Sequence, residues 1–299
     1  MLVDSGRLHI AVQKSGRLAD LSRALLRDAG LRIQNGKNAL TARVENLPID
    51  LMFVRDDDIP TFVADGVCEF GMVGRNVLEE FALDRPDAAF EVVAPLGFGR
   101  CALKIAAPEA TPYTGYTGPE TLAGARIATS YPRLLRRFLD ERGIEATVVK
   151  MNGAVELAPR LGIAGFVCDL VSTGATLEAN GLAPVETVLE SEAVLVRTKK
   201  PLPQDKQTLC DNLWRRIEGV LATQESKYIM LNAPQEALEA ITAILPGAEA
   251  PTVIPLAGQP GHFAVHAVCK ESVFWETLQE LKSAGASAIL VMPIEKMMM

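Results

Sequence analysis

The stretch Val167–Leu177 places an acidic side chain near the end of an apolar run and follows it with small hydroxyl residues, a glycine and an alanine. The apolar run predicts a strand that delivers Asp169 to its end, and a helix should begin close to Thr176. Small residues let backbone N–H groups close around a phosphate, and a helix N-terminus adds partial positive charge. The hydroxyls of Ser172, Thr173 and Thr176, with the backbone at Gly174 and Ala175, therefore suit a phosphate.

The carboxylate of Asp169 suits a second task, because it can accept hydrogen bonds from the vicinal hydroxyls of a ribose. A loop that holds both a phosphate and ribose hydroxyls fits a 5-phosphoribosyl group. The residue types alone also fit a capped strand-to-helix turn with no ligand, since Ser, Thr and Gly are common before helices.

Cations follow two other predicted strands. Lys14, Gly16 and Arg17 come after Leu8–Val12, and Arg55 comes after the apolar segment 51–54. Arg can hold a phosphate through two parallel hydrogen bonds, whereas Lys acts as a mobile point charge. Together these side chains could neutralise a polyphosphate. The alternative is a solvated basic face at the start of two helices.

Two further segments suit close approach of the backbone to a nucleotide. Thr129, Ser130 and Tyr131 lie at a predicted strand-to-helix junction, and Gly71 and Gly74 lie in and after another strand. Asp56, Asp57 and Asp58 are more typical of a solvated helix start than of a metal site. We therefore assign no protein-held metal.

The sequence lacks the residue patterns that several other reaction classes require. The sequence contains no GxxxxGK[ST] phosphate loop, and no Ser-His-Asp or Cys-His constellation is recognisable. His262 and His266 have i, i+4 spacing, but they fall in a predicted turn and strand, so a zinc pair on one helix face is not expected.

Strands and helices alternate along residues 8–182, which predicts an α/β fold. Similar helix–Gly–strand segments at 65–71 and 161–169 suggest two alike lobes, with ligands beyond the carboxyl ends of the strands. Local signals include a hairpin turn at Asn35–Gly36, a cap at Asn76 for a helix over 77–83, a helix over 154–161 and a long helix over 207–225.

Residues 226–299 follow a different order. Strand, helix, two strands, helix and strand are predicted over 228–231, 234–245, 252–255, 264–268, 272–284 and 288–291. This βαββαβ order is that of a small ferredoxin-like domain.

The composition is that of a globular chain of 299 residues with a formal net charge of -7, which argues against a protein that coats nucleic acid. The five cysteines are far apart and form no CxxC pair, as expected in a reducing compartment. With no apolar run long enough for a signal peptide or a bilayer span, we expect a cytoplasmic protein with no membrane association.

Several of these segments resemble the ATP phosphoribosyltransferase family, the first enzyme of histidine biosynthesis, in its long, self-regulated form. The resemblance rests on residues 169–176, with Glu156, Gly162, Ala164 and Val167 upstream, and on the segments 13–18, 54–60, 128–132 and 290–297.

The resemblance implies two lobes of the periplasmic-binding-protein type, at 1–94 plus 186–225 and at 95–185, and a regulatory ferredoxin-like domain at 226–299. It implies that Glu156 and Asp169 hold the ribose hydroxyls of phosphoribosyl pyrophosphate and that Thr173–Thr176 hold its 5-phosphate. ATP would attack through adenine N1, with Mg²⁺ carried on pyrophosphate. Lys14, Arg17 and Arg55 would be the catalytic cations, and the nucleotide would lie near Gly16, Gly71, Gly74 and residues 129–131.

The family also implies inhibition by histidine and a homo-oligomer, between a dimer and a hexamer. Asn232, Ser287 and Ala288 are the expected effector contacts. Two positions depart from the family pattern: Arg75 stands where an acidic residue is expected, and Arg100 lies two places before the expected basic position, Ala102. The rival interpretation is a two-lobed solute sensor with a regulatory tail.

Overall fold

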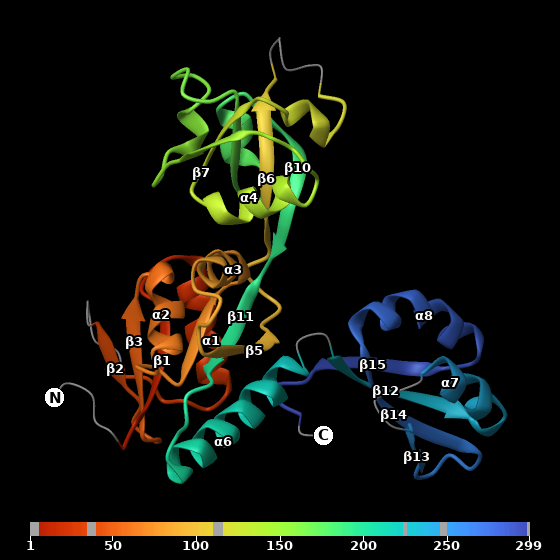
Figure 1. Cartoon of the computed structure of the whole chain (residues 1–299). Coiled ribbons are helices and arrows are strands. Elements are labelled where there is room, and N and C mark those ends of the chain that lie inside the picture. Colours follow the sequence, from red (N-terminus) through yellow and green to blue (C-terminus); the bar gives the residue numbers. More distant parts are fainter. Residues whose placement is uncertain (1–5, 35–39, 110–115, 224–225, 246–249, 298–299) are drawn as a thin grey trace. The chain divides into compact units, whose positions relative to one another are not determined.

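The computed structural model describes residues 6–34, 40–109, 116–223, 226–245 and 250–297 (Figure 1). The chain separates into two compact units. The first comprises Met1–Arg27 and Leu31–Cys210, and the second comprises Asp28–Gly30 and Asp211–Met299. The expected hairpin turn at Asn35–Gly36 lies outside the described residues.

The first unit contains a six-stranded sheet in the order β2-β3-β1-β4-β11-β5. Its strands are β1 (Leu8–Gln13), β2 (Thr41–Arg43), β3 (Ile49–Val54), β4 (Phe70–Gly74), β5 (Phe90–Pro95) and β11 (Ala193–Thr198). Its helical segments are α1 (Arg17–Asp28), η1 (Asp56–Asp58), α2 (Ile59–Ala64) and α3 (Arg75–Asp84). β1 is parallel to β3 and β4, so the carboxyl ends of these strands lie at one edge.

The same unit contains a five-stranded sheet in the order β10-β6-β9-β7-β8. Its strands are β6 (Cys101–Pro108), β7 (Arg126–Thr129), β8 (Thr147–Lys150), β9 (Phe166–Val171) and β10 (Leu182–Ser191). The helical segments are η3 (Pro119–Leu122), α4 (Pro132–Asp140), η4 (Val155–Leu157) and α5 (Ala175–Ala179). β7 is parallel to β8 and β9, which again places their carboxyl ends at one edge.

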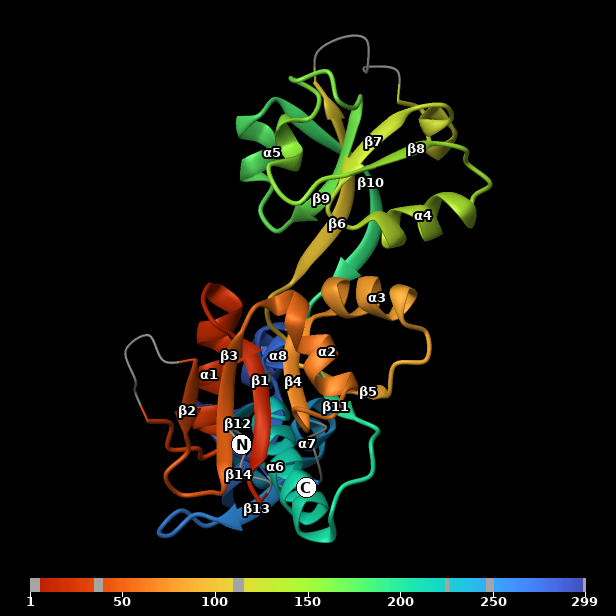
Figure 2. The ribbon, with the colours of Figure 1, turned by 60° about the vertical axis from the view of Figure 1, so that its left-hand side comes forward.

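The two sheets share one pattern of pairing. Read as β3-β1-β4-β11-β5 and β8-β7-β9-β6-β10, each has two parallel neighbours followed by two antiparallel ones. Figures 1 and 2 show β10 of one sheet continuing into β11 of the other. The expected α/β fold with two alike lobes is confirmed. The ranges assigned to the lobes stay a prediction; strand pairing changes sheet between Pro95 and Cys101 and between Ser191 and Ala193.

Alternating side chains give the five-stranded sheet two buried faces. On one face Ile105, Ile127 and Phe166 pack with the leucines of α4. On the other face Ala106, Ala128 and Val167 pack with α5 and the η4 turn. A strand that is covered on both sides should read as an apolar run, and β9 does so apart from Asp169. Because the first half of β9 is buried between these two faces, the strand places Asp169 at the edge of the core.

Three local expectations were wrong. The helix expected over 154–161 is only the η4 turn, because Pro159 has no N–H to donate and Ala154 has a positive φ of 50°. The long helix α6 runs over Gln204–Leu221 rather than 207–225. Asn76 does not cap α3; it lies inside the helix, and Gly74 holds the cap position.

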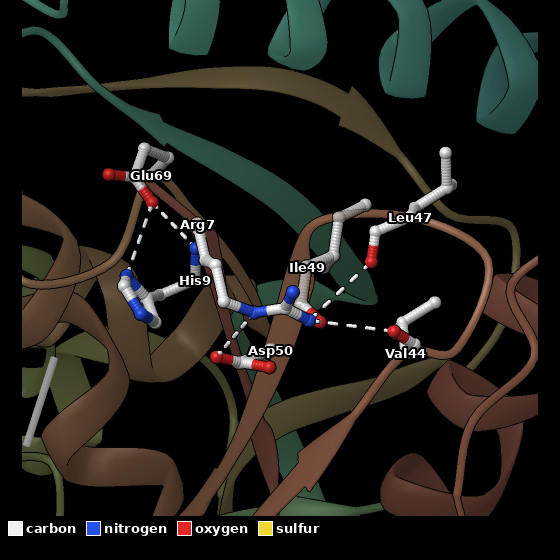
Figure 3. Close-up of polar contacts among 7 residues, drawn as sticks. All are labelled: Arg7, His9, Val44, Leu47, Ile49, Asp50 and Glu69. Atoms are coloured by element: carbon white, nitrogen blue, oxygen red, sulfur yellow. Dashed lines mark hydrogen bonds and ion pairs between the residues drawn. The ribbon is translucent and has the colours of Figure 1, made fainter. Parts of the chain in front are cut away.

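A polar cluster lies at the opposite edge of the six-stranded sheet, near the start of β1 and β4 (Figure 3). Glu69 is buried and accepts the His9 amide at 2.6 Å and the Lys206 ammonium at 2.7 Å. The guanidinium of Arg7 bonds Asp50 at 2.9 Å and the carbonyl of Ile49 at 2.8 Å. Since Lys206 belongs to α6, which enters the second unit, this cluster holds the beginning of that helix on the first unit.

The second unit carries the four-stranded antiparallel sheet β13-β14-β12-β15. Its elements are β12 (Ser226–Pro234), η5 (Gln235–Ala237), α7 (Leu238–Ile244), β13 (Thr252–Pro255), β14 (His262–Lys270), α8 (Glu271–Ser283) and β15 (Ser287–Pro293). The predicted βαββαβ order is confirmed. Ile229, Leu231, Val265 and Ile241 form its core with α7 and α8.

Within the described part of the chain, no helix combines the length and apolar character needed to cross a membrane.

Candidate active site

Asp169 lies in β9, partly buried, and its Oδ1 accepts the amide of Leu170 at 2.8 Å. Burial raises the pKa of this carboxyl; the amide of Leu170 lowers it, and the negative charge of Glu156 raises it further. The two carboxylates expected at the ribose therefore lie close enough to feel each other's charge, although they come from separate segments. Two carboxylates that share a site repel each other, and hydrogen bonds from hydroxyl donors reduce that repulsion.

The loop after β9 turns through Gly174, whose φ of 84° is one that glycine adopts at little cost. Ala175 and Thr176 then begin α5, which has only five residues. So short a helix has a small dipole, and the phosphate affinity expected of this loop must come mainly from N–H groups and hydroxyls.

A first cavity of about 440 Å³ joins the loop to the six-stranded sheet. Its lining residues are Arg17, Leu18, Leu21, Asp56, Gly74, Asn76, Val77, Gly99, Arg100, Cys101, Leu170 and Ser172. Arg17 from the start of α1 and Ser172 from the loop thus face one space. The expected cation and the expected sugar-phosphate loop are brought together here.

A second cavity of about 590 Å³ lies at the start of α4. Its lining residues are Arg55, Asp56, Asp57, Val77, Glu80, Ser130, Tyr131, Pro132, Arg133, Lys150, Met151 and Asn152. Asp56 and Val77 line both cavities, so the two spaces are neighbours. Arg55, Ser130 and Tyr131 were expected from the sequence, and they share this second cavity.

Ten of the expected sugar-phosphate, nucleotide and catalytic residues line neither of these two cavities: Lys14, Gly16, Gly71, Thr129, Glu156, Asp169, Thr173, Gly174, Ala175 and Thr176. Gly71 is a packing position, because a Cβ there would lie 2.7 Å from Ile59 Cγ2 and 2.9 Å from Val63 Cγ2. Thr129 is buried, and its hydroxyl accepts the Tyr131 amide at 2.9 Å, which shapes the turn into α4. Lys14 is exposed.

Sequence reasoning missed several cavity residues, including Asn76, Glu80 and Lys150. Lys150 ends β8, so its place at a carboxyl strand edge was a usable signal. Glu80 gave no local signal: from α3 its carboxylate accepts the amides of Arg133 and Leu134 at 3.0 and 2.9 Å, which caps α4.

The structure shows where the two residues that depart from the family pattern lie. Arg100 lines the first cavity and lies 4.0 Å from Glu192, so it adds a cation there. Arg75 begins α3, and its amide donates to the Glu192 carbonyl at 2.9 Å.

The described residues contain no group of three or more His, Cys, Asp or Glu side chains that could hold a metal ion. Asp56 and Asp57 nevertheless line the second cavity, and burial together with Asp56 and Asp58 raises the pKa of Asp57. Two carboxylates suit a Mg²⁺ ion that takes most of its ligands from substrate phosphates and water.

The expected effector contacts are also close together. Asn232 pairs with Ser287 between β12 and β15 at an irregularity in the register, and the Ser287 hydroxyl donates to the Asn232 carbonyl at 3.4 Å. Ala288 follows with a positive φ of 48°, which is strained for a residue with a side chain.

Comparison with known proteins decides the family. A family model described as ATP phosphoribosyltransferase matches residues 55–219, and a model of the HisG C-terminal domain matches residues 223–296. This chain belongs to the ATP phosphoribosyltransferase family. Because the C-terminal domain is present, it is of the long form of ATP phosphoribosyltransferase, a transferase family of histidine biosynthesis.

Solved structures resemble the chain at lower identity. An ATP phosphoribosyl transferase (HisG:HisZ) complex from Thermotoga maritima is 24% identical with a TM-score of 0.57, over 71% of this chain and 98% of that one. This likeness shows a shared fold. A histidine kinase sensor domain with similarity to periplasmic binding proteins is 11% identical with a TM-score of 0.45, over 71% and 89% of the chains. The Bordetella pertussis BvgS periplasmic VFT2 domain is 16% identical with a TM-score of 0.44, over 72% and 88%.

Proposed function

We propose that this ATP phosphoribosyltransferase transfers the 5-phosphoribosyl group of phosphoribosyl pyrophosphate to N1 of ATP and releases pyrophosphate. The observation that supports this most directly is the first cavity, where Ser172 of the sugar-phosphate loop and Arg17 face the same space. One face offers hydroxyl and amide donors for the 5-phosphate, and the other offers a cation for the leaving pyrophosphate.

Asp169 and Glu156 are proposed to accept hydrogen bonds from the ribose hydroxyls. Burial, and after it the negative charge of Glu156, raises the pKa of Asp169, and hydroxyl donors would relieve the repulsion between the two carboxylates. Thr173, Gly174, Ala175 and Thr176 would hold the 5-phosphate. Binding the sugar at both ends fixes its C1 carbon toward the cavity, which is the positioning that a displacement at C1 requires.

ATP is proposed to occupy the second cavity, with Ser130 and Tyr131 beside it and Arg55 close to its phosphates. Adenine N1 forms the new bond to C1, and the bond from C1 to pyrophosphate oxygen breaks with its electron pair. N1 is a neutral nucleophile, so no strong general base is needed. The contribution of Lys14, Arg17 and Arg55 is then electrostatic, toward the phosphates of ATP and the charge that develops on the leaving group.

Mg²⁺ is proposed as the cofactor, bound mainly by pyrophosphate, with Asp56 and Asp57 as the carboxylates within its reach. When bound it would neutralise charge on the leaving group. The protein's part is to hold the phosphates through its cations and to present Asp56, which lines both cavities, and Asp57, which lines the second.

Histidine is proposed as a feedback inhibitor at Asn232, Ser287 and Ala288, in a cytoplasmic homo-oligomer. The support is local: these residues meet where β12 and β15 are irregular, and an irregular strand pair leaves backbone groups open to a small ligand. An effector acts only by binding one global state better than another.

The test is to mix the protein with ATP, Mg²⁺ and phosphoribosyl pyrophosphate and to measure pyrophosphate. The proposal expects release that needs all three additions. A folded protein that binds phosphoribosyl pyrophosphate but releases no pyrophosphate would instead be the two-lobed binding module.

A further inference from the structure

The polar side chain of Asn76 is the centre of a buried hydrogen-bond network. Its Nδ2 donates to the hydroxyl of Tyr131 at 2.9 Å, and its Oδ1 accepts from the hydroxyl of Ser191 at 2.8 Å. Its own amide donates to Ser191 Oγ at 3.1 Å. Only 3% of Asn76 is exposed, so leaving one of its polar groups unpaired would be costly.

The three residues come from three different segments. Asn76 is in the first turn of α3, beside the six-stranded sheet, and Tyr131 precedes α4 of the five-stranded sheet. Ser191 ends β10, where the chain leaves the five-stranded sheet to become β11. One side chain therefore ties both sheets to a segment that crosses between them.

The crossing segment also caps α3. The amides of Arg75 and Asn76 donate to the Glu192 carbonyl and to Ser191 Oγ at 2.9 and 3.1 Å. The side chain of Asn76 packs closely against Gly74. A Cβ at Gly74 would lie 2.5 Å from Asn76 Oδ1. Asn76 and Gly74 line the first cavity and Tyr131 lines the second, so the network lies where the two cavities adjoin.

We propose that Asn76 is a positioning residue that sets the placement of the second cavity relative to the first. It acts through Tyr131 and Ser191, and it touches neither reacting atom. This inference rests on the proposed function: the transfer needs both cavities aligned, whereas phosphoribosyl pyrophosphate is held largely by the loop of the five-stranded sheet. Loss of the network should therefore slow the transfer and leave the affinity for the sugar phosphate unchanged.

Burial raises the pKa of the Tyr131 hydroxyl, so this group is protonated at neutral pH and accepts the Asn76 bond through its oxygen. Replacing Tyr131 by Phe removes this acceptor and keeps the ring that lines the second cavity. Tyr116→Phe is the matched control, because the buried Tyr116 hydroxyl has no hydrogen-bond partner among the described residues. Ser191→Ala breaks the other half of the network.

In Tyr131→Phe and in Ser191→Ala, kcat is expected to fall by about tenfold to a hundredfold, the scale of a small misplacement of reacting groups. The Kd of phosphoribosyl pyrophosphate, measured by titration, should stay within about twofold of wild type. A twofold change in Kd corresponds to a change in binding free energy well under about 1.4 kcal/mol. Tyr116→Phe should match wild type in both. An unchanged kcat in both network variants would overturn the proposal, and so would an equal loss of kcat and of sugar-phosphate affinity.

Hydrogen exchange of the full-length protein gives a readout that does not depend on the reaction. Amides at the starts of α3 and α4 should exchange faster in Tyr131→Phe and Ser191→Ala, and not in Tyr116→Phe. If wild type released no pyrophosphate, the proposed function would fail, yet this arm would still decide whether Asn76 ties the segments together. Identical exchange in all four proteins would contradict the network's role.

Discussion

The ammonium of Lys206 lies 2.7 Å from Glu69 Oε1, and the Glu69 carboxylate is itself 3% exposed. Glu69 immediately precedes β4, which ends at Gly74 in the first cavity, and Lys206 lies in the first turns of α6. This ion pair therefore connects the helix that enters the second unit with a strand that reaches the active site.

Removing one partner should be costly, because it leaves a buried charge. Lys206→Met is expected to lower the free energy of unfolding by about 3–5 kcal/mol in chemical denaturation. The double variant Lys206→Met with Glu69→Gln should recover part of that loss. Lys199→Met, at an exposed position, is the control and should change stability by less than about 0.5 kcal/mol. Additive effects in the double variant would show that the pair is not coupled.

His9 should make stability depend on pH. Burial lowers the pKa of its imidazole from 6.5, against the raising effect of Glu69, and its Nδ1 has no hydrogen-bond partner within the described structure. The native protein thus favours neutral His9, so its contribution to stability is complete above pH 6.5 and is lost as the pH falls through the lowered value. Because the imidazole of His9 binds one proton, it can change the free energy of unfolding by at most about 1.4 kcal/mol per pH unit.

The measurement is the free energy of unfolding between neutral pH and the acid limit of folding. His9→Phe should flatten the dependence, and His262→Gln, at an exposed position, should not. The same slope in wild type and in His9→Phe would exclude His9 as its source.

Arg17 and Arg27 offer a matched pair on α1. Arg17 begins the helix and lines the first cavity, whereas Arg27 lies in its last turn, about 15 Å further along the axis. If Arg17 contacts phosphates, the KM of wild type for phosphoribosyl pyrophosphate should rise with ionic strength, and Arg17→Ala should flatten that rise. Arg27→Ala should behave as wild type. A KM that is insensitive to salt in all three proteins would show that Arg17 belongs to a solvated basic face and does not contact phosphates.

Ser287 tests the effector site. Losing its hydroxyl should weaken inhibition by histidine about fivefold, the value of roughly one neutral hydrogen bond, and leave the uninhibited rate near that of wild type. Ser283→Ala, on the exposed end of α8, is the control. Unchanged inhibition in Ser287→Ala would place the effector elsewhere.

The features that could be predicted from the sequence are those that a local pattern of residues determines. The buried apolar runs of β1 and β9 and the βαββαβ order of the second unit were readable, and the assignment of the loop from Asp169 to Thr176 stays a prediction. β10 was missed because partly buried and exposed positions are mixed along it, without a continuous apolar run. Asn76 and Glu80 were beyond reach because their partners are 55 and 53 residues away in sequence, and only the tertiary fold brings them together.

The assignment of the loop after β9 is tested most directly by titrating phosphoribosyl pyrophosphate into wild type and into Asp169→Ala at neutral pH. The account predicts that the folded variant binds the sugar phosphate more weakly by about 1.5–3 kcal/mol, the value of hydrogen bonds to a charged group, while its affinity for ATP changes little. Because the pKa of Asp169 is raised, the advantage of wild type over Asp169→Asn should also shrink as the pH falls and the carboxylate is protonated. Equal affinity of wild type and Asp169→Ala for phosphoribosyl pyrophosphate would contradict the central claim.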